Sequence, residues 1–257
     1  MVINMAGRSV NCRYNSENRR LIKESRVKST QILGEAIARR SPAPRLWLQA
    51  STATIYSDRY DTANDEATGI LGGAEPNAPD TWGFSIDVAT SWERALNESE
   101  TPHTRKVLLR SAMVMSPDRG GVFDTFLKLV RYGLGGRAGK GGQFVSWIHD
   151  QDFIRAIYWL IEHEELEGPV NLAAPGPVPN SEFMQTLRAA WGISFGVPAT
   201  EWMLEIGAYF LRTETELILK SRRVVPGRLL QSGFVFQFGT WREAAYDLCE
   251  RLRERNE

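Results

Sequence analysis

The sequence predicts an α/β fold in which a doubly wound parallel sheet carries helices on both faces and an α-rich lobe follows. Three observations support this prediction. Apolar runs of strand length alternate with longer helical segments over the first 175 residues. Several of these runs end in small or hydroxyl-bearing residues. Beyond Gly192 the strand-length runs give way to helical, charged segments.

Composition and charge bound the class of protein. The 257 residues are 42% hydrophobic and 24% charged, which is typical of a soluble globular protein. Lys+Arg and Asp+Glu both number 31, so bulk electrostatic binding to nucleic acid or to an anionic membrane is not expected. We also expect neither a membrane span nor a signal peptide. Cys12 and Cys249 are isolated, so we expect reduced thiols in a cytoplasmic protein.

The first two strands and the helix between them set the direction of the sheet. The chain opens with an apolar run that indicates a buried parallel strand ending in Ala6 and Gly7. A helix follows, and Ser41-Pro-Ala-Pro44 ends it. The next strand, residues 46–50, runs into the hydroxyl-rich residues 51–56. The order strand, helix, strand implies a right-handed parallel crossover.

The remaining elements are expected in the same alternation. Residues 57–81 form a long polar loop, and loops of that length in compact domains are often functional. The segments that follow are expected to be a helix at 82–97, a strand at 106–115, a helix at 122–132, a strand at 143–148, a helix from Asp152 to about 165, a strand at 170–174, a helix from Asn180 or Ser181 closed by Gly192, and a last helix containing Trp241 and Leu252.

Hydroxyl groups at the carboxyl end of a central strand are the first candidate site. In open α/β sheets ligands bind at that end. Ser51 and Thr52 can therefore hydrogen-bond a substrate carbonyl or hydroxyl. The alternative is that both hydroxyls only satisfy backbone groups where the strand ends.

The glycine-rich segment 133–142 does not have the spacing of a phosphate loop. Leu134 stands where the Walker A pattern needs glycine, and Gly141 follows Lys140 where a magnesium ligand is needed. We expect a loop beside the substrate cleft in which Arg137 and Lys140 meet an anionic substrate. A plain flexible connection is the alternative.

Two charged clusters are expected to bind neither a metal nor a nucleic acid. His149, Asp150 and Asp152 supply a single nitrogen ligand, so no metal site is expected. Residues 212–228 alternate in sign, which is typical of solvated side-chain pairs on a helix. A partner-facing surface in a homodimer is the alternative for this segment.

Several blocks of sequence carry a family resemblance. They are Val2–Gly7, Leu48–Tyr56, Leu109–Met113, Val145–Asp152, Val170–Pro175, Arg212–Leu217 and Ser221–Arg228. The chain resembles the extended short-chain dehydrogenase/reductase superfamily, in the NAD-dependent epimerase/dehydratase-like branch with a C-terminal domain of unknown function (DUF1731). This resemblance covers essentially the whole chain. It implies a Rossmann-like domain over residues 1–175 and a C-terminal domain over 176–257.

The resemblance implies an oxidoreductase that binds NADP or NAD and acts on a small-molecule substrate. Thr52 matches the family's catalytic Ser or Thr and would orient the reacting oxygen. The residues implied in cofactor binding are Ala6, Gly7, Ser51, Ser111 and Ala112. Those implied in substrate binding are Arg137 and Gln143.

The expected absence of the glycine-rich turn that binds the cofactor pyrophosphate is a first departure from the family. In the superfamily a glycine-rich turn after the first strand holds the pyrophosphate at a helix N-terminus. This chain resembles the family from its fourth strand onward. We therefore expect that two preceding βα units, roughly 60–80 residues, are absent, together with the residues that choose between NAD and NADP.

The catalytic pair is a second departure. The superfamily uses a Tyr-x-x-x-Lys pair, in which the lysine lowers the tyrosine pKa so that the phenol can transfer a proton. The matching residues here are 82–86 or, in a shifted register, 84–88, and neither stretch contains the pair. No lysine occurs between Lys28 and Lys106. Tyr56 and Tyr60 are the candidate substitutes.

Three interpretations of function stay open. The chain is an oxidoreductase or epimerase with an atypical catalytic group, a non-catalytic small-molecule-binding or regulatory module, or an inactive fragment that needs further N-terminal strands. Whether it is an enzyme is therefore not decided by the sequence.

Overall fold

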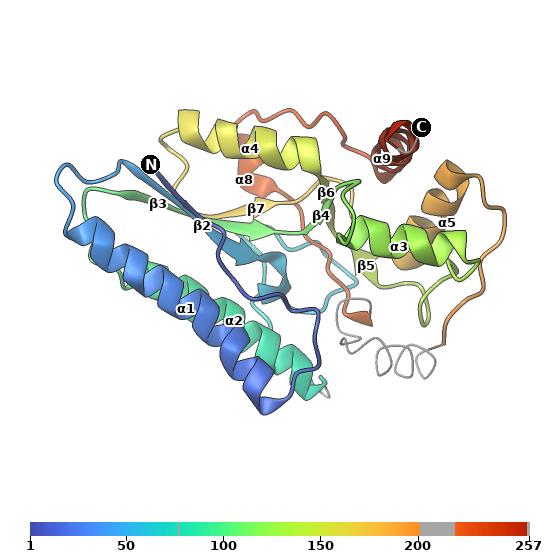
Figure 1. Ribbon diagram of the computed structural model, residues 1–257, viewed down its shortest axis with the longest axis horizontal. Coiled ribbons are helices and arrows are strands. Elements are labelled where there is room, and N and C mark those ends of the chain that lie inside the picture. The colour runs from blue at the N-terminus through green and yellow to red at the C-terminus, as the bar shows by residue number, and fades with distance from the viewer. Residues whose placement is uncertain (77, 201–218, 256–257) are drawn as a thin grey trace.

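A parallel sheet of four strands organises the computed structural model, which describes residues 1–76, 78–200 and 219–255 (Figure 1). Its strand order is β1-β2-β3-β7, and every pairing is parallel. The strands are β1 (Val2–Asn4), β2 (Leu46–Thr52), β3 (Arg105–Ser111) and β7 (Gly168–Leu172). Helices flank both faces, so the predicted Rossmann-like α/β architecture is confirmed.

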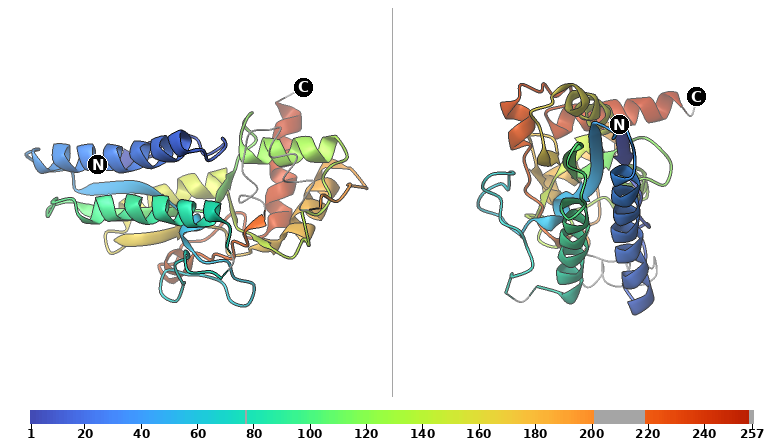
Figure 2. Two further views of the ribbon diagram at one scale, coloured as in Figure 1. Left: turned by 90° about the horizontal axis from the view of Figure 1, so that it is seen from below. Right: turned by 90° about the vertical axis from the view of Figure 1, so that its left-hand side faces the viewer.

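Two long helices cover one face of the sheet. These helices, α1 (Ser16–Ala38) and α2 (Asp80–Asn97), run side by side in both views of Figure 2. Trp47 of β2 points toward them and packs in a cluster with Ile37 and Leu96. Alternate residues of a strand face opposite sides of its sheet, so the neighbours of Trp47 serve the other face.

The opposite face packs against α4 (Asp150–Glu162) and the short helix α8 (Gly227–Gln231). Leu46 and Leu48 of β2 belong to this second cluster, with Leu160 of α4. None of the helices in the described ranges combines the length and the apolar character that crossing a lipid bilayer requires.

The strand β1 lies at the edge of the described sheet. It pairs with β2 through Val2 and Trp47. Its apolar run predicted burial on both faces, but the side chains of Ile3 and Met5 are 42% and 47% exposed. The difference follows from the position of β1, which has one strand neighbour among the described residues.

The predicted strand at 106–115 is two strands, because the chain changes its partner at Ala112. The backbone N–H of Ala112 donates to Leu172 of β7 (3.0 Å), whereas that of Met113 donates to Ser146 (3.3 Å). The predicted strand at 143–148 is divided in the same way. The short strands that result are β4 (Met113–Met115), β5 (Phe144–Val145) and β6 (Trp147–His149); β4 pairs with β6, and β5 pairs with β8 (Val178–Pro179).

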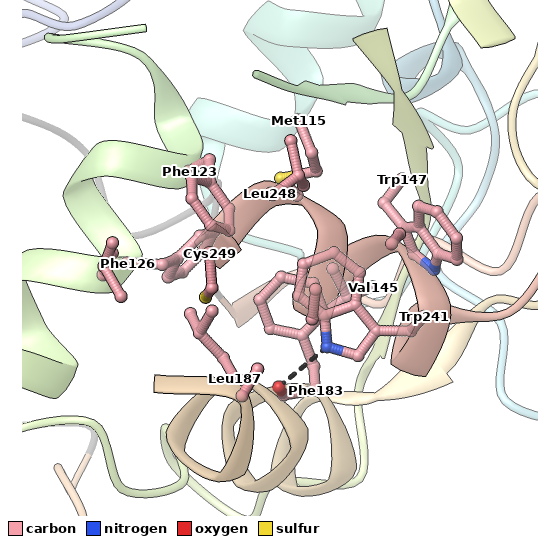
Figure 3. Close-up of a cluster of buried hydrophobic side chains, with 14 of the residues drawn as sticks. Met115, Phe123, Phe126, Val145, Trp147, Phe183, Leu187, Trp241, Leu248 and Cys249 are labelled. Carbon is pink, nitrogen blue, oxygen red and sulfur yellow. Dashed lines mark hydrogen bonds between the residues drawn. The ribbon is translucent and has the colours of Figure 1, made fainter. Parts of the chain in front are cut away.

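A second core forms a helical lobe beside the sheet (Figure 3). Phe183 and Trp241 stack at its centre with ring centroids 4.1 Å apart, and the indole Nε1 donates to the Phe183 carbonyl (2.9 Å). The lobe includes α3, which precedes residue 176, so chain from both sides of the expected domain boundary builds it. Its helices are α3 (Val122–Arg131), α5 (Asn180–Trp191) and α9 (Trp241–Glu254).

Helix ends agree with the prediction at one site and differ at another. Gly192 closes α5 in a left-handed conformation with φ of 87°, as predicted. The helix expected to start at Asp152 instead begins at Asp150, and His149 is its N-cap. Asp152 lies inside the first turn, where its carboxylate accepts from Arg155 of the same helix and from backbone N–H groups of another segment.

The charged segment 212–228 differs from the expected solvated helix face. Residues 212–218 lie outside the described residues. In the described part Lys220 and Arg222 are 1% and 7% exposed. The Ser221 backbone N–H donates to Asp58 Oδ1 (2.6 Å), which holds this stretch beneath the loop that follows β2.

Candidate functional site

A pocket of about 310 Å³ opens at the carboxyl ends of β2 and β3, between α1 and α2. This is the end of an open parallel sheet where ligands bind. The described residues that line it are Val10, Tyr14, Ile22, Arg26, Ser51, Thr52, Ala53, Thr54, Phe84, Ser85, Val88, Trp92, Ser111, Ala112, Met113 and Arg222. The sequence had singled out four of them: Ser51, Thr52, Ser111 and Ala112.

Hydroxyl groups line the floor of this pocket. Ser51 Oγ donates to Glu93 Oε1 (2.6 Å). Thr52 Oγ1 donates to Thr54 Oγ1 (3.1 Å) and accepts the Thr54 backbone N–H (3.2 Å), which caps the short 3₁₀ turn Ala53–Ile55. Thr52 thus satisfies the backbone at the strand end and also lines the pocket, and the binding of a substrate by its hydroxyl stays a prediction.

A buried polar network supports that floor. Arg110 donates to both carboxylate oxygens of Glu93 (Nε–Oε1 2.8 Å, Nη2–Oε2 2.7 Å). Burial alone would lower the pKa of Arg110, but the Glu93 carboxylate outweighs it and the pKa is raised. Arg110 also donates to the Tyr56 hydroxyl (2.9 Å), which itself donates to Asn171 Oδ1 (2.9 Å). Every member of this network has a partner, so the network fixes the ends of β2 and β3 against α2.

The residues at the family's Tyr-x-x-x-Lys positions are apolar. Phe84 and Val88, one helical turn apart on α2, both line the pocket. In the other register, Ile86 is 6% exposed and lies against Gly72 and Gly73. Of the two registers, 84–88 is the one whose two positions both line the pocket, with a phenyl ring and an isopropyl group.

Arg26 of α1 is a pocket residue that the sequence did not single out. Its Nη1 donates to the carbonyls of Ile22 and Arg8 (both 3.0 Å), and its guanidinium lies over the Trp92 ring, 5.1 Å from the centroid. Burial lowers the pKa of Arg26, with Tyr14 opposing that effect. The sequence did hold a sign of this role, because Arg26 lies four residues before Thr30 and so falls on the buried side of the predicted helix.

Tyr14 was also missed. It lies in the segment before α1, and its ring packs edge-on against Phe84, with centroids 5.0 Å apart and planes at 71°. A phenol from this segment thus packs against Phe84, the first residue of the register 84–88. No local pattern marks such a residue, because the contact depends on how α1 lies against α2.

The other predicted site residues do not line the pocket. Ala6 and Gly7 are exposed, although Gly7 is a near neighbour of Arg26, whose Cζ would lie 3.1 Å from an added Cβ.

Tyr56 is 2% exposed with its hydroxyl engaged in the network, and Tyr60 is 54% exposed. Arg137 is exposed, and Gln143 is buried with Nε2 donating to the Ala138 carbonyl (3.0 Å).

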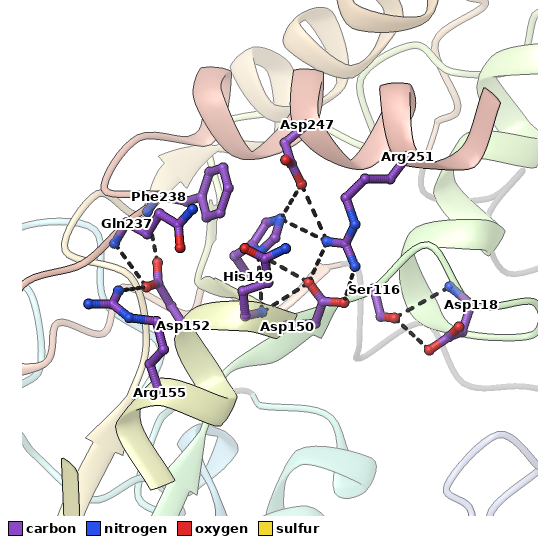
Figure 4. Close-up of polar contacts among 11 residues, drawn as sticks. Ser116, Asp118, His149, Asp150, Asp152, Arg155, Gln237, Phe238, Asp247 and Arg251 are labelled. Atoms are coloured by element: carbon purple, nitrogen blue, oxygen red, sulfur yellow. Dashed lines mark hydrogen bonds and ion pairs between the residues drawn. The ribbon is translucent and has the colours of Figure 1, made fainter. Parts of the chain in front are cut away.

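The His149 cluster joins the helical lobe to the sheet (Figure 4). His149 Nε2 lies 2.9 Å from Asp247 Oδ2, and Arg251 donates to both oxygens of Asp150 (2.8 and 2.9 Å). The Arg251 guanidinium lies between these carboxylates. Over the described ranges, no three His, Cys, Asp or Glu side chains come together as metal ligands would.

Comparison with known proteins places the chain in a family. Residues 1–173 match the model of the NAD dependent epimerase/dehydratase family. Residues 199–248 match a domain of unknown function, DUF1731. The chain belongs to the NAD-dependent epimerase/dehydratase family, as its sequence blocks indicated.

Several individual proteins are similar along nearly the whole chain. An epimerase family protein of Staphylococcus aureus (strain MW2), MW0731, is 31% identical over 251 residues, which are 97% of this chain and 79% of that protein. The crystal structure of human epimerase family protein SDR39U1 (isoform 2) with NADPH superposes with a TM-score of 0.86 at 29% identity, covering 97% of this chain and 81% of that one. Thermus thermophilus UDP-glucose 4-epimerase with NAD shares the fold, with a TM-score of 0.72 at 17% identity over 98% and 76% of the two chains.

The pocket residues fit one end of a nicotinamide cofactor. Hydroxyl groups and the small side chain of Ala112 line the pocket of about 310 Å³ at the carboxyl ends of β2 and β3. The pyrophosphate end finds no match in the described chain, where Gly7 is the one glycine between β1 and α1. A glycine-rich strand-to-helix turn is what that end requires.

Proposed function

We propose that this protein is an NAD(P)-dependent oxidoreductase of the epimerase/dehydratase type that acts on a small molecule without the Tyr-x-x-x-Lys pair. The observation that carries the proposal is the composition of one pocket. Thr52, at the carboxyl end of a parallel strand, shares it with Phe84 and Val88, which match the two positions of the missing pair in the register 84–88.

The chain's own residues divide the work as follows. A bound nicotinamide would supply or accept the hydride. Thr52 holds the reacting oxygen through its hydroxyl, which Thr54 orients. The apolar wall formed by Phe84, Val88 and Trp92 excludes water from that oxygen. Tyr14 is the phenol among the described lining residues, so it is the group proposed to exchange the proton.

The nucleotide proposed for first trial is NADPH. The human relative with this ligand is 29% identical, whereas the NAD-bound epimerase from Thermus thermophilus is 17% identical and supports the fold alone.

A non-catalytic binding module is the second candidate. The apolar pair Phe84 and Val88 favours it, because neither side chain can transfer a proton. In this case the pocket still binds the cofactor, but the protein catalyses no reaction.

Thermal melts with cofactor test whether either candidate holds. A ligand that binds only the folded chain stabilises it by about 2.7 kcal/mol at 100 times its Kd, so Tm is expected to rise with NADPH or NADH. A flat response up to millimolar cofactor contradicts both candidates.

A dehydrogenase screen then separates the two candidates. Cofactor-dependent turnover that falls at least about tenfold in Thr52→Ala and Tyr14→Phe supports the enzyme. Thr125→Ala, which changes an exposed hydroxyl on α3, is the matched control. Binding without turnover across the screen supports the module and overturns the enzyme.

A further inference from the structure

We infer that Arg26 and Arg222 form an anion subsite in the Thr52 pocket, selecting small ligands with an apolar or aromatic body and one carboxylate or phosphate group. The inference rests on the proposed function, because it names the class of substrate that the same pocket takes.

The charged side chains among the described residues that line the pocket are all positive. Its described lining includes two arginines and no aspartate or glutamate. The carboxylate just behind the floor, Glu93, already binds both Arg110 and Ser51. Among the described lining residues an anion would therefore meet two arginines and no carboxylate, while Asp58, outside this lining, interacts with Arg222.

Arg26 has donors available for such an anion. Both hydrogen bonds of its side chain within the described residues leave from Nη1 and end on backbone carbonyls. Its Nε and Nη2 donate to none of the described residues, and it forms no ion pair among them. A guanidinium presents its donors in a planar fork that matches the two oxygens of a carboxylate or phosphate.

Arg222 contributes from another wall. Its side chain is buried, and Nε donates to Thr54 Oγ1 (3.3 Å), which is the group bonded to Thr52. Its backbone N–H donates to the Phe144 carbonyl (2.8 Å), so the end of β5 holds this residue in place. The cation of Arg222 is thereby linked through Thr54 to the hydroxyl that orients the reacting group.

The remaining walls define the body of the ligand. Tyr14, Phe84 and Trp92 give the pocket aromatic surfaces, and Arg26 lies over the Trp92 ring. The volume of about 310 Å³ is at the small end of ligand pockets. A single ring bearing one anionic group matches this combination of size, apolar surface and charge.

Three one-ring probes test the subsite on the full chain: benzoate, phenyl phosphate and the neutral benzyl alcohol. Calorimetric titration should show an anionic probe binding at least about tenfold more tightly than benzyl alcohol. Arg26→Gln is expected to remove that preference while leaving the affinity for benzyl alcohol within about twofold. The matched control is Arg39→Gln, at the C-cap of the same helix, whose side chain is 79% exposed and which should behave as wild type.

Two further variants and a salt titration test the subsite if Arg26→Gln does not melt cooperatively and is therefore misfolded. Arg222→Gln is expected to reduce the same preference, and Arg26→Lys is expected to keep part of it because the charge stays while the fork is lost. In the wild type, raising salt from about 50 to about 500 mM should weaken anion binding and leave the neutral probe unchanged. The tighter of the two anions identifies the group as carboxylate or phosphate.

The outcomes separate this inference from the proposed function. The NADPH-dependent rise in Tm is measured on the same protein samples. Equal binding of anionic and neutral probes by the wild type, or a preference that survives in both Arg26→Gln and Arg222→Gln, overturns the subsite even if NADPH still raises Tm. An anion preference that depends on Arg26, with no response to NADPH, supports the subsite and overturns the proposed function.

Discussion

Glu93 of α2 and Arg110 of β3 form a two-point ion pair directly behind Ser51, with N–O distances of 2.8 and 2.7 Å. Both residues are 7% exposed. Ser51 Oγ donates to the same carboxylate (2.6 Å), so a hydroxyl on the pocket wall is fixed by charges beneath it. The helix that carries Phe84 and Val88 is thus tied to the strand ends that carry Thr52 and Ser111.

Removing one partner of this pair should destabilise the protein strongly. Arg110→Met leaves the Glu93 carboxylate buried without its cation, and the free energy of unfolding is expected to fall by about 3–5 kcal/mol. Urea denaturation measures the change. The matched control is Arg39→Met in the Arg39–Glu35 pair, whose side chains are 79% and 64% exposed, where a loss of about 0–1 kcal/mol is expected. A loss below about 1 kcal/mol for Arg110→Met would show that the pair does not support the pocket floor.

Asp152 should hold the segment before α9 against α4. Its carboxylate accepts the backbone N–H groups of Gln237 (2.9 Å) and Phe238 (2.8 Å), and the residue is fully buried (Figure 4). Asp152→Asn keeps one acceptor oxygen and removes the charge, so a loss of about 1.5–3 kcal/mol is expected.

Hydrogen exchange locates the effect of that change. The amides of Gln237 and Phe238 should lose protection in Asp152→Asn, whereas those of α5 should keep it. Asp124→Asn on α3, where the carboxylate binds an exposed lysine, serves as the control. Unchanged protection at both amides would refute the proposed tether.

His149 should make stability depend on pH in a narrow window. Burial lowers its pKa below the ordinary value of 6.5, although Asp150 and Asp247 oppose that effect. The native state therefore favours the neutral ring, while the unfolded chain takes up a proton near pH 6.5. The free energy of unfolding should fall as the pH drops below about 6.5.

Asp150 acts in a different window. Burial raises its pKa, but the hydrogen bond from Arg251 and the neighbouring charges outweigh burial and lower it. The stability it contributes is lost only when the pH falls below its ordinary value of 3.8. Tm is therefore measured between about pH 7.5 and about pH 5, above the range in which Asp150 contributes. His149→Asn should flatten that slope and the exposed His103→Asn should not; equal slopes in both variants would remove His149 as the cause.

The fold was predictable where local pattern and tertiary structure agree. The apolar run at 46–50 could be placed in a parallel sheet, and Gly192 could be placed at a helix end, because period and backbone conformation depend on the residues themselves. The break at Ala112 could not be predicted. An unbroken apolar run gives no sign that consecutive amides will bond to Leu172 and then to Ser146, which is a choice made by distant segments.

The site residues at a strand end could be predicted, whereas those brought to the pocket by tertiary packing could not. Ser51 and Thr52 follow from their place at a strand end, and the structure puts both on the pocket wall. Arg26 and Arg222 are nearly 200 residues apart in sequence and meet the pocket only through tertiary packing. Tyr56 looked equally available in its hydroxyl-rich stretch, but Arg110 and Asn171, both distant in sequence, engage its hydroxyl.

The central claim is that a nicotinamide cofactor binds beside Thr52, and its most direct test is the Kd of NADPH measured by cofactor fluorescence. Wild type should show saturable binding. Ala112→Phe fills the pocket and should raise the Kd at least about tenfold, while Ala67→Phe at an exposed position leaves it unchanged. The absence of saturable binding by wild type, or an unchanged Kd in a cooperatively folded Ala112→Phe variant, would contradict the claim.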